Sequence, residues 1–125
     1  MTTTDTIHTT LNGHWRQTRC NDNGEEITAA ETGGATLCEF RNGEFCVRAE
    51  NGEILLAGTY RLNADTQPHT IDWTDTVGED KGKTFLAIFT LTDNTFTFVA
   101  ADEDMARPVS FEPQTGHTIR TFHRI

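Results

Sequence analysis

The side chains able to do acid–base, nucleophilic or metal chemistry are scattered along this chain. No two of its five histidines stand three or four residues apart, so none form a helical metal-ligand pair: His8, His14, His69, His117 and His123. Asp72 could orient His69 as a base, but the two fall on opposite faces of a predicted strand. Ser-His-Asp spacing, a glycine-rich phosphate loop and a nucleophile elbow are all missing from the sequence. We therefore predict no metal site and no cofactor, and the sequence assigns no catalytic residue.

The three cysteines are Cys20, Cys38 and Cys46. An odd number, with no leader sequence and no CxxC pair, argues against a disulfide framework and a zinc knuckle. If Asn42-Gly43 is a two-residue hairpin turn, Cys38 and Cys46 face opposite sides of the sheet and cannot form a bridge. We expect the thiols to be small buried hydrophobic groups rather than nucleophiles.

A few polar side chains are predicted to face the interior of the fold. Arg107 shares a strand face with Phe111, and a buried arginine needs a partner, for which Asp72 is the candidate. The two could form a structural ion pair, or Arg107 could bind an anion in a pocket. Tyr60, with Gln17 and Arg107, would give an apolar interior the few polar groups of a ligand pocket. A packed core with one satisfied hydroxyl is the simpler alternative.

The chain is short and acidic. Its 125 residues suffice for one domain, and 10 lysines and arginines stand against 19 aspartates and glutamates, a formal charge of −9. This charge disfavours nucleic acids and anionic membranes and favours a basic protein or a cationic ligand, although it can also serve solubility alone. Asp102-Glu103-Asp104 lacks the spacing of a calcium loop and is expected to be a solvated turn. With no signal-peptide pattern and no stretch of transmembrane length, we expect a cytoplasmic protein.

The elements that must position these residues are predicted to be strands. The clearest is a β-hairpin from Thr84 to Ala100, TFLAIFTLTDNTFTFVA, in which Asp93-Asn94 tolerates the positive φ of a tight turn. One face of this hairpin is wholly apolar and predicts a core, and the other carries threonines. The turn predicts three apolar cross-strand pairs, namely Leu91 with Phe96, Phe89 with Phe98, and Ala87 with Ala100.

A second hairpin is predicted across Asn42-Gly43, between residues 35–41 and 44–50, with Phe40 opposite Phe45. Gly58, on the next strand, falls opposite Phe45 and suggests a bend that the ring covers. Further strands are expected over residues 14–20, 54–62, 69–75, 107–111 and 117–124. In the first of these strands Trp15, Gln17 and Arg19 share a face, and in the last Thr118, Arg120, Phe122 and Arg124 do.

Residues 1–10 are polar and predict a loose arm before a single domain at 11–125, and 28–34 predicts a loop. We find no convincing amphipathic helix. About eight to nine short strands joined by short turns predict an all-β fold, a small antiparallel up-and-down β-barrel. Closure removes the strand edges, and the interior of a barrel of this size is either packed or holds one small ligand.

At Gly13-His14-Trp15 the chain resembles the lipocalin and calycin superfamily, whose barrels open with Gly-x-Trp on the first strand. The resemblance implies that Trp15 plugs one end of a lipocalin-like barrel and that Arg124 or Arg120 lies across its ring as a cation–π partner. The chain is also similar to a small lipocalin-like domain family common in planctomycete proteins. That pattern continues at Gly58-Thr59-Tyr60, Pro68-His69-Thr70-Ile71-Asp72, Arg107-Pro108-Val109-Ser110-Phe111 and Arg124. This family implies a fold but no common activity.

Three functions follow as hypotheses. The first is non-enzymatic binding of a small, largely apolar ligand in the barrel. The second is an acidic protein-binding module, such as an inhibitor or immunity protein, that covers a basic partner with the loops around Asp75, Glu79, Asp80 and 102–104. The third is a cyclase or isomerase that positions a flexible substrate in the cavity. The predicted ligand-binding residues are Gln17, Tyr60, Leu62, Trp73, Phe85, Phe89, Phe96, Phe98, Arg107 and Phe111.

Overall fold

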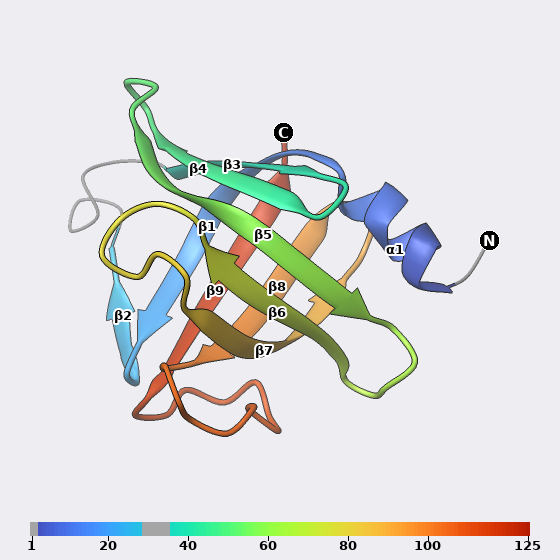
Figure 1. Cartoon of the computed structure of the whole chain (residues 1–125), viewed down its shortest axis with the longest axis vertical. Coiled ribbons are helices and arrows are strands. Elements are labelled where there is room, and N and C mark those ends of the chain that lie inside the picture. Colours follow the sequence, from blue (N-terminus) through green and yellow to red (C-terminus); the bar gives the residue numbers. More distant parts are fainter. Residues whose placement is uncertain (1–2, 29–35) are drawn as a thin grey trace.

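The computed structural model describes residues 3–28 and 36–125, and it shows a closed β-barrel with a short helix at one end (Figure 1). Within these ranges no helix has the length and apolar character that a membrane crossing requires. In chain order the elements are α1 (Thr3–Leu11), β1 (Gly13–Asp22), β2 (Glu25–Ile27), β3 (Thr36–Arg41), β4 (Glu44–Ala49), β5 (Ile54–Asn63), β6 (His69–Asp75), β7 (Thr84–Leu91), β8 (Thr95–Ala101) and β9 (His117–Arg124).

The barrel is an antiparallel up-and-down sheet, as predicted. Strands β3 to β9 pair in sequence order, β3 pairs with β1, and β1 closes the barrel by pairing with β9. Eight strands therefore form the closed wall, and the short strand β2 adds to the end of β1. Closure leaves the eight wall strands without an open edge, which protects them from pairing with other chains.

The two hairpins that the turn signals predict have the expected register. Asn42 and Gly43 have the positive φ expected of a tight turn, but Asp93 and Asn94 do not, so the turn type predicted for the second hairpin is wrong. Across β7 and β8, Leu91 pairs with Phe96, Phe89 with Phe98, and Ala87 with Ala100. Across β3 and β4, Phe40 pairs with Phe45 and Cys38 with Val47, so Cys46 lies on the other face. Cys20, Cys38 and Cys46 are free thiols, as expected.

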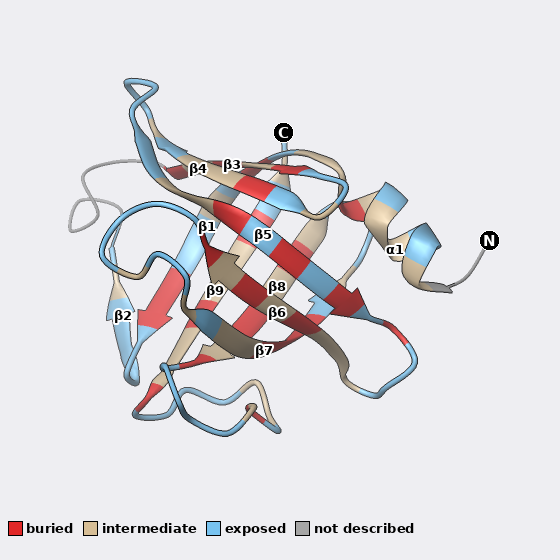
Figure 2. Ribbon diagram, in the orientation of Figure 1, coloured by how far each residue is buried: buried red, intermediate tan, exposed pale blue. Residues whose placement is uncertain are grey.

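The side chains facing inward form one aromatic core. Buried and exposed residues alternate along the strands, which is the pattern of a barrel with a filled inner face (Figure 2). Trp15, Phe40, Phe89 and Phe96 are among the largest side chains that are almost fully buried. Phe96 is central to this core, because its ring contacts those of Trp15, Phe40, Phe89 and Phe122.

The prediction of a loose arm over residues 1–10 is wrong for the described part of that segment, which belongs to helix α1. The segment is polar except for Ile7 and Leu11, which lie four residues apart and therefore on one face of a helix. Leu11 is fully buried and Ile7 packs against the core, so the helix is held by its contacts with the barrel. The low helix propensity of a threonine-rich segment does not predict this helix, because the packing against the barrel stabilises it.

Trp15 plugs the barrel end next to α1, as the resemblance implied. The ring is fully buried, and its Nε1 donates a hydrogen bond to the Leu11 carbonyl oxygen at 2.9 Å. The guanidinium carbon of Arg124 lies 4.2 Å from the ring centroid. Arg124 is therefore the cation–π partner, and the assignment of Arg120 to this plug is wrong, because Arg120 points into the barrel further along β9.

The strand predicted over residues 107–111 is also wrong. No strand is assigned between Asp102 and Gly116, and the buried Pro108 offers no backbone N–H to a sheet. This segment instead crosses the outside of the barrel, where Phe111 packs against Ile88, Val99 and Ile119. These three side chains face away from the barrel axis but are almost fully buried. The cover that Phe111 provides explains why the outer face of their strands is apolar there.

A β-bulge in β1 makes the predicted alternation of the first strand wrong. The register of β1 against β9 shifts between Gln17 and Arg19, so these two residues do not share a face. Arg19 lies outside, where its Nη2 forms an ion pair with Glu26 Oε1 at 2.6 Å. Of the loop predicted at 28–34, only Thr28 belongs to the described residues.

Candidate functional site

A cavity of about 520 Å³ opens at the barrel end opposite α1 and Trp15. Every wall strand contributes to it, because its lining includes residues of β1 and of β3 to β9. Its volume falls within the range of pockets that hold small organic ligands. Three loop or strand-end carboxylates, those of Asp75, Asp80 and Asp102, also border it.

The deep wall of the cavity is aromatic. The ring centroid of Trp73 lies 5.2 Å from that of Phe45 and 4.9 Å from that of Phe98, and the Phe98 ring stacks on Phe122 at 6.2 Å. All four rings border the cavity. Trp73 is 7% exposed, and its Nε1 is buried with no hydrogen-bond partner among the described residues. The wall therefore offers large apolar surfaces and one free donor.

Two polar side chains meet on the β1–β9 side of the cavity. Arg120 Nη1 donates a hydrogen bond to Gln17 Oε1 at 2.8 Å. Arg120 is half-buried, and none of the ion pairs among the described residues involves it. Gln17 uses one acceptor to hold the guanidinium in place, and the remaining guanidinium donors stay available.

An acidic residue lies on the opposite wall. Asp75 ends β6, is 6% exposed, and follows Ile71 and Trp73 on the inward face of that strand. Its carboxylate has no hydrogen bond or ion pair within the described ranges. Burial, with a smaller contribution from the negative charge of Asp80, raises the pKa of Asp75 above its ordinary value.

The predicted ligand-binding residues fall into three groups. Gln17, Trp73, Phe85 and Phe98 border the cavity. Tyr60, Leu62, Phe89 and Phe96 face inward but are packed in the buried core, nearer the plugged end, and do not border it. Arg107 and Phe111 lie outside the barrel, so their placement in the interior is wrong.

Arg107 has the partner that the sequence suggested, on the outer face. Its Nη1 lies 2.7 Å from Asp72 Oδ1 and donates to the Ala87 carbonyl oxygen at 2.8 Å. Both contacts fix segment 102–116 against β6 and β7. The alternative that Arg107 reads an anion inside a pocket loses its basis, because the side chain is outside and already paired.

The sequence reasoning missed the roles of two cavity residues. The resemblance offers Arg120 as an alternative to Arg124 at the Trp15 plug, although the strand face that Arg120 shares with Phe122 places it inward. The sequence analysis places Asp75 in an acidic loop, although the alternation Ile71, Trp73, Asp75 continues the inward face to the end of the strand. The strand period of two was therefore sufficient to find both.

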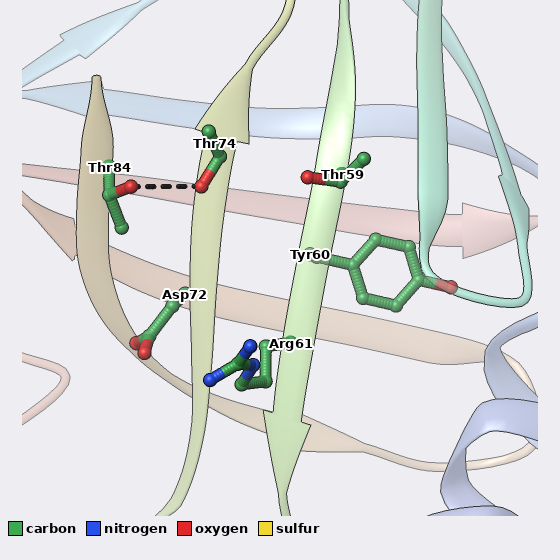
Figure 3. Close-up of a pocket in the computed structure, with 6 residues that line it drawn as sticks. All are labelled: Thr59, Tyr60, Arg61, Asp72, Thr74 and Thr84. Carbon is green, nitrogen blue, oxygen red and sulfur yellow. Dashed lines mark hydrogen bonds between the residues drawn. The ribbon is translucent and has the colours of Figure 1, made fainter. Parts of the chain in front are cut away.

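A second hollow, of about 470 Å³, lies on the outer face of β5, β6 and β7 (Figure 3). Thr59, Thr74 and Thr84 line it, and a hydrogen bond of 2.9 Å joins the hydroxyl oxygens of Thr74 and Thr84. The Tyr60 side chain points away from these groups (Figure 3). This surface is polar: the threonine hydroxyls and Arg61 line it, and the carboxylate of Asp72 is already paired with Arg107. The barrel cavity is the better candidate site.

The cavity holds no arrangement suited to metal or thiol chemistry. Within residues 3–28 and 36–125 no group of three or more histidine, cysteine, aspartate or glutamate side chains is placed to bind a metal ion. Cys38 borders the cavity, but burial strongly raises the pKa of its thiol, so the reactive thiolate is suppressed. Cys38 therefore acts as an apolar wall group. No protein-family model and no curated protein matches this chain.

Proposed function

We propose that this chain binds a small, largely apolar ligand inside its barrel. The observation that carries the proposal is the cavity of about 520 Å³, whose wall of aromatic rings is interrupted by a few polar groups. Burial against Trp73, Phe98 and Phe122 would supply the affinity through the hydrophobic effect. The Gln17–Arg120 pair and the free Trp73 Nε1 would fix the orientation of the ligand.

The cost of an unfilled cavity supports the same proposal. Protein interiors pack densely, and a void in the core costs stability because its lining loses contacts. The plugged half of this barrel is filled by Trp15, Phe89 and Phe96, none of which borders the cavity, so the chain can pack its core where binding does not require space. An open half beside a filled half therefore supports a binding role rather than a purely structural one.

The Trp15–Arg124 plug and the eight-stranded closure are the grounds for relating the chain to lipocalin-like proteins, including the small lipocalin-like domain family common in planctomycete proteins. We infer a carrier or sensor, because the cavity offers aromatic surfaces with a few hydrogen-bonding groups, and burial raises the pKa of the one thiol that borders it, that of Cys38. Free Cys20, Cys38 and Cys46 fit a reducing compartment such as the cytoplasm. A cyclase or isomerase acting by positioning would use the same cavity, and conversion of the bound molecule would identify it.

The test is fluorescence titration with N-phenylnaphthylamine, an uncharged apolar fluorophore that brightens when it leaves water. Saturable enhancement by the native protein supports the proposal. Ala100 borders the cavity on β8, so Ala100→Phe should fill part of the space and weaken binding about tenfold or more. The control is Thr90→Phe, which adds a similar side chain at an exposed position of β7. Equal binding by both variants would place the fluorophore outside the barrel and refute the proposal.

A second candidate is an acidic module that covers a basic protein. It is favoured by the gathering of Asp75, Asp80 and Asp102 at one end of the barrel, where Leu55 and Val77 are exposed. An apolar centre with charges around it is a common interface composition. A basic partner would bind with an affinity that falls steeply with ionic strength, and Ala100→Phe would leave that affinity unchanged.

A further inference from the structure

Asp75 stands out among the carboxylates that border the cavity, because it is buried and its charge has no partner among the described residues. Its backbone is fixed at both groups, since its N–H donates to the Lys83 carbonyl oxygen at 3.2 Å and its own carbonyl oxygen accepts from the Gly82 N–H at 2.8 Å. The side chain, on the inward face of β6, is 6% exposed and borders the cavity. In the described part of the chain its carboxylate forms neither a hydrogen bond nor an ion pair.

A buried carboxylate without a partner destabilises the fold, and proteins rarely keep one without a use. The nearby cations are committed elsewhere. Lys83 Nζ lies 3.2 Å from Asp80 Oδ1 and 2.9 Å from Glu103 Oε2. Arg120 is bonded to Gln17 and forms no ion pair with Asp75. The site therefore has an unneutralised negative charge at the boundary between the mouth and the aromatic wall.

The other features of the cavity favour a positive charge in the ligand. Three carboxylates and one guanidinium border it, and only the Asp80 carboxylate is paired with a lysine, so the charge around the cavity is negative. The wall next to Asp75 is aromatic: Trp73 precedes it by two residues on the same face, with Phe45 and Phe98 packed on that ring. Aromatic faces attract organic cations and tolerate their apolar parts. A bare metal ion lacks a ligand set among the described residues.

We propose that the natural ligand is an amphipathic organic cation, whose protonated amine pairs with the carboxylate of Asp75 while its apolar body lies against Trp73, Phe45 and Phe98. This inference rests on the proposed function and narrows its ligand class. An anionic ligand held by Arg120 is the opposite outcome. It is disfavoured because the negative charges of Asp75 and Asp102, which form no ion pair among the described residues, would repel it.

The experiment compares three probes with the same alkyl chain and different head groups: octylamine, octanol and octanoate. Each displaces N-phenylnaphthylamine from the native protein at neutral pH and low salt, and its dissociation constant follows from the loss of fluorescence. Octylamine should bind about tenfold or more tightly than octanol. Its ammonium group would form a charge-assisted hydrogen bond with the partly desolvated Asp75 carboxylate, which is stronger than a neutral hydrogen bond. Octanoate should bind more weakly than octanol.

The variant is Asp75→Asn, which keeps the shape of the side chain and removes its charge. It should retain octanol binding and lose most of the preference for octylamine. The matched control is Asp104→Asn, which makes the same change in net charge at an exposed residue that does not border the cavity. Asp104 has a positive φ of 63°, a conformation that asparagine tolerates well.

The outcomes separate the two proposals. If octanol displaces the fluorophore but octylamine binds no better, or octanoate binds best, the cavity binds ligands and the cation proposal is wrong. The same holds if Asp104→Asn lowers the octylamine preference as much as Asp75→Asn does, because a general charge effect then explains it. If the native protein binds neither the fluorophore nor any probe, the proposed function itself fails.

Discussion

Arg124, the penultimate residue, ties the last strand to the first strand and to the helix. Its guanidinium lies 4.2 Å from the ring centroid of Trp15 and donates hydrogen bonds to the carbonyl oxygens of Asp93 at 2.7 Å and Asn12 at 3.2 Å, and to that of Thr10. The Thr10 and Asn12 carbonyls belong to the end of α1 and the residue that follows it. One planar cation thus satisfies the helix end and covers the buried tryptophan.

Arg124→Lys should lower the free energy of unfolding by about 2 kcal/mol, because an ammonium cannot reach three carbonyls and cover the ring together. Urea unfolding followed by tryptophan fluorescence measures this loss. Arg16→Lys, at an exposed position of β1, is the matched control and should change stability by less than about 0.5 kcal/mol. Equal effects of the two variants would mean that the plug contributes nothing specific.

Gly58→Ala should be among the most damaging small substitutions in the chain. A Cβ at this position would collide with the Thr74 carbonyl oxygen and lie 2.8 Å from Cε1 of Phe45, whose ring covers the glycine. Relief requires movement of β6, so we expect a loss of about 2–4 kcal/mol in thermal or urea unfolding.

Gly52→Ala is the control for that substitution. Gly52 has a φ of +88° and open space around its α-carbon, so only backbone strain of about 1–2 kcal/mol is expected. If Gly58→Ala were no worse than Gly52→Ala, the sheet at Phe45 would be less tightly closed than the register implies.

Phe89 and Phe98 are cross-strand neighbours with different surroundings. Phe89 is 1% exposed and packs in the core, whereas Phe98 borders the cavity. Phe89→Ala should cost about 3–5 kcal/mol, and Phe98→Ala at least about 1 kcal/mol less, because part of its surface already faces space rather than atoms. Phe98→Ala should also weaken binding of N-phenylnaphthylamine. Equal losses of stability would indicate that Phe98 is packed as tightly as Phe89.

The barrel was predictable from the sequence because its signals are local. Asn42-Gly43 and Asp93-Asn94 define tight turns, and a turn fixes the register of both flanking strands, as the pairs Phe40–Phe45 and Phe89–Phe98 show. The errors lie where tertiary contacts decide. Segment 102–116 has a plausible strand pattern, but Pro108 and the outer cluster around Ile88 direct it across the barrel wall.

The candidate site was only partly predictable for a related reason. Alternation places Trp73 and Phe98 inside, but it cannot tell a ring that fills the core from a ring that borders space, so Phe89 and Phe96 were assigned to the same pocket. The bulge between Gln17 and Arg19 reverses which side chains of β1 face inward beyond that point, and no glycine or turn residue in the sequence indicates it.

The ionisation of Asp75 gives the last prediction. Burial, and then Asp80, raise its pKa in the folded protein above the ordinary 3.8, so the folded state keeps the proton to a higher pH than the unfolded chain does. Between the two pKa values the folded state binds more protons. Unfolding free energy therefore falls as pH rises through that window, and the full penalty applies above it.

Asp75→Asn cannot ionise, so the ligand-free variant should be more stable than the native protein at neutral pH. This difference should shrink as the pH falls through the raised pKa towards 3.8. Urea unfolding of both proteins at a series of pH values measures it, with Asp104→Asn as the exposed control that should follow the native profile. A variant less stable than the native protein at neutral pH would show that the Asp75 carboxylate has a favourable partner within the protein. The charge would then be structural rather than held ready for a cationic ligand.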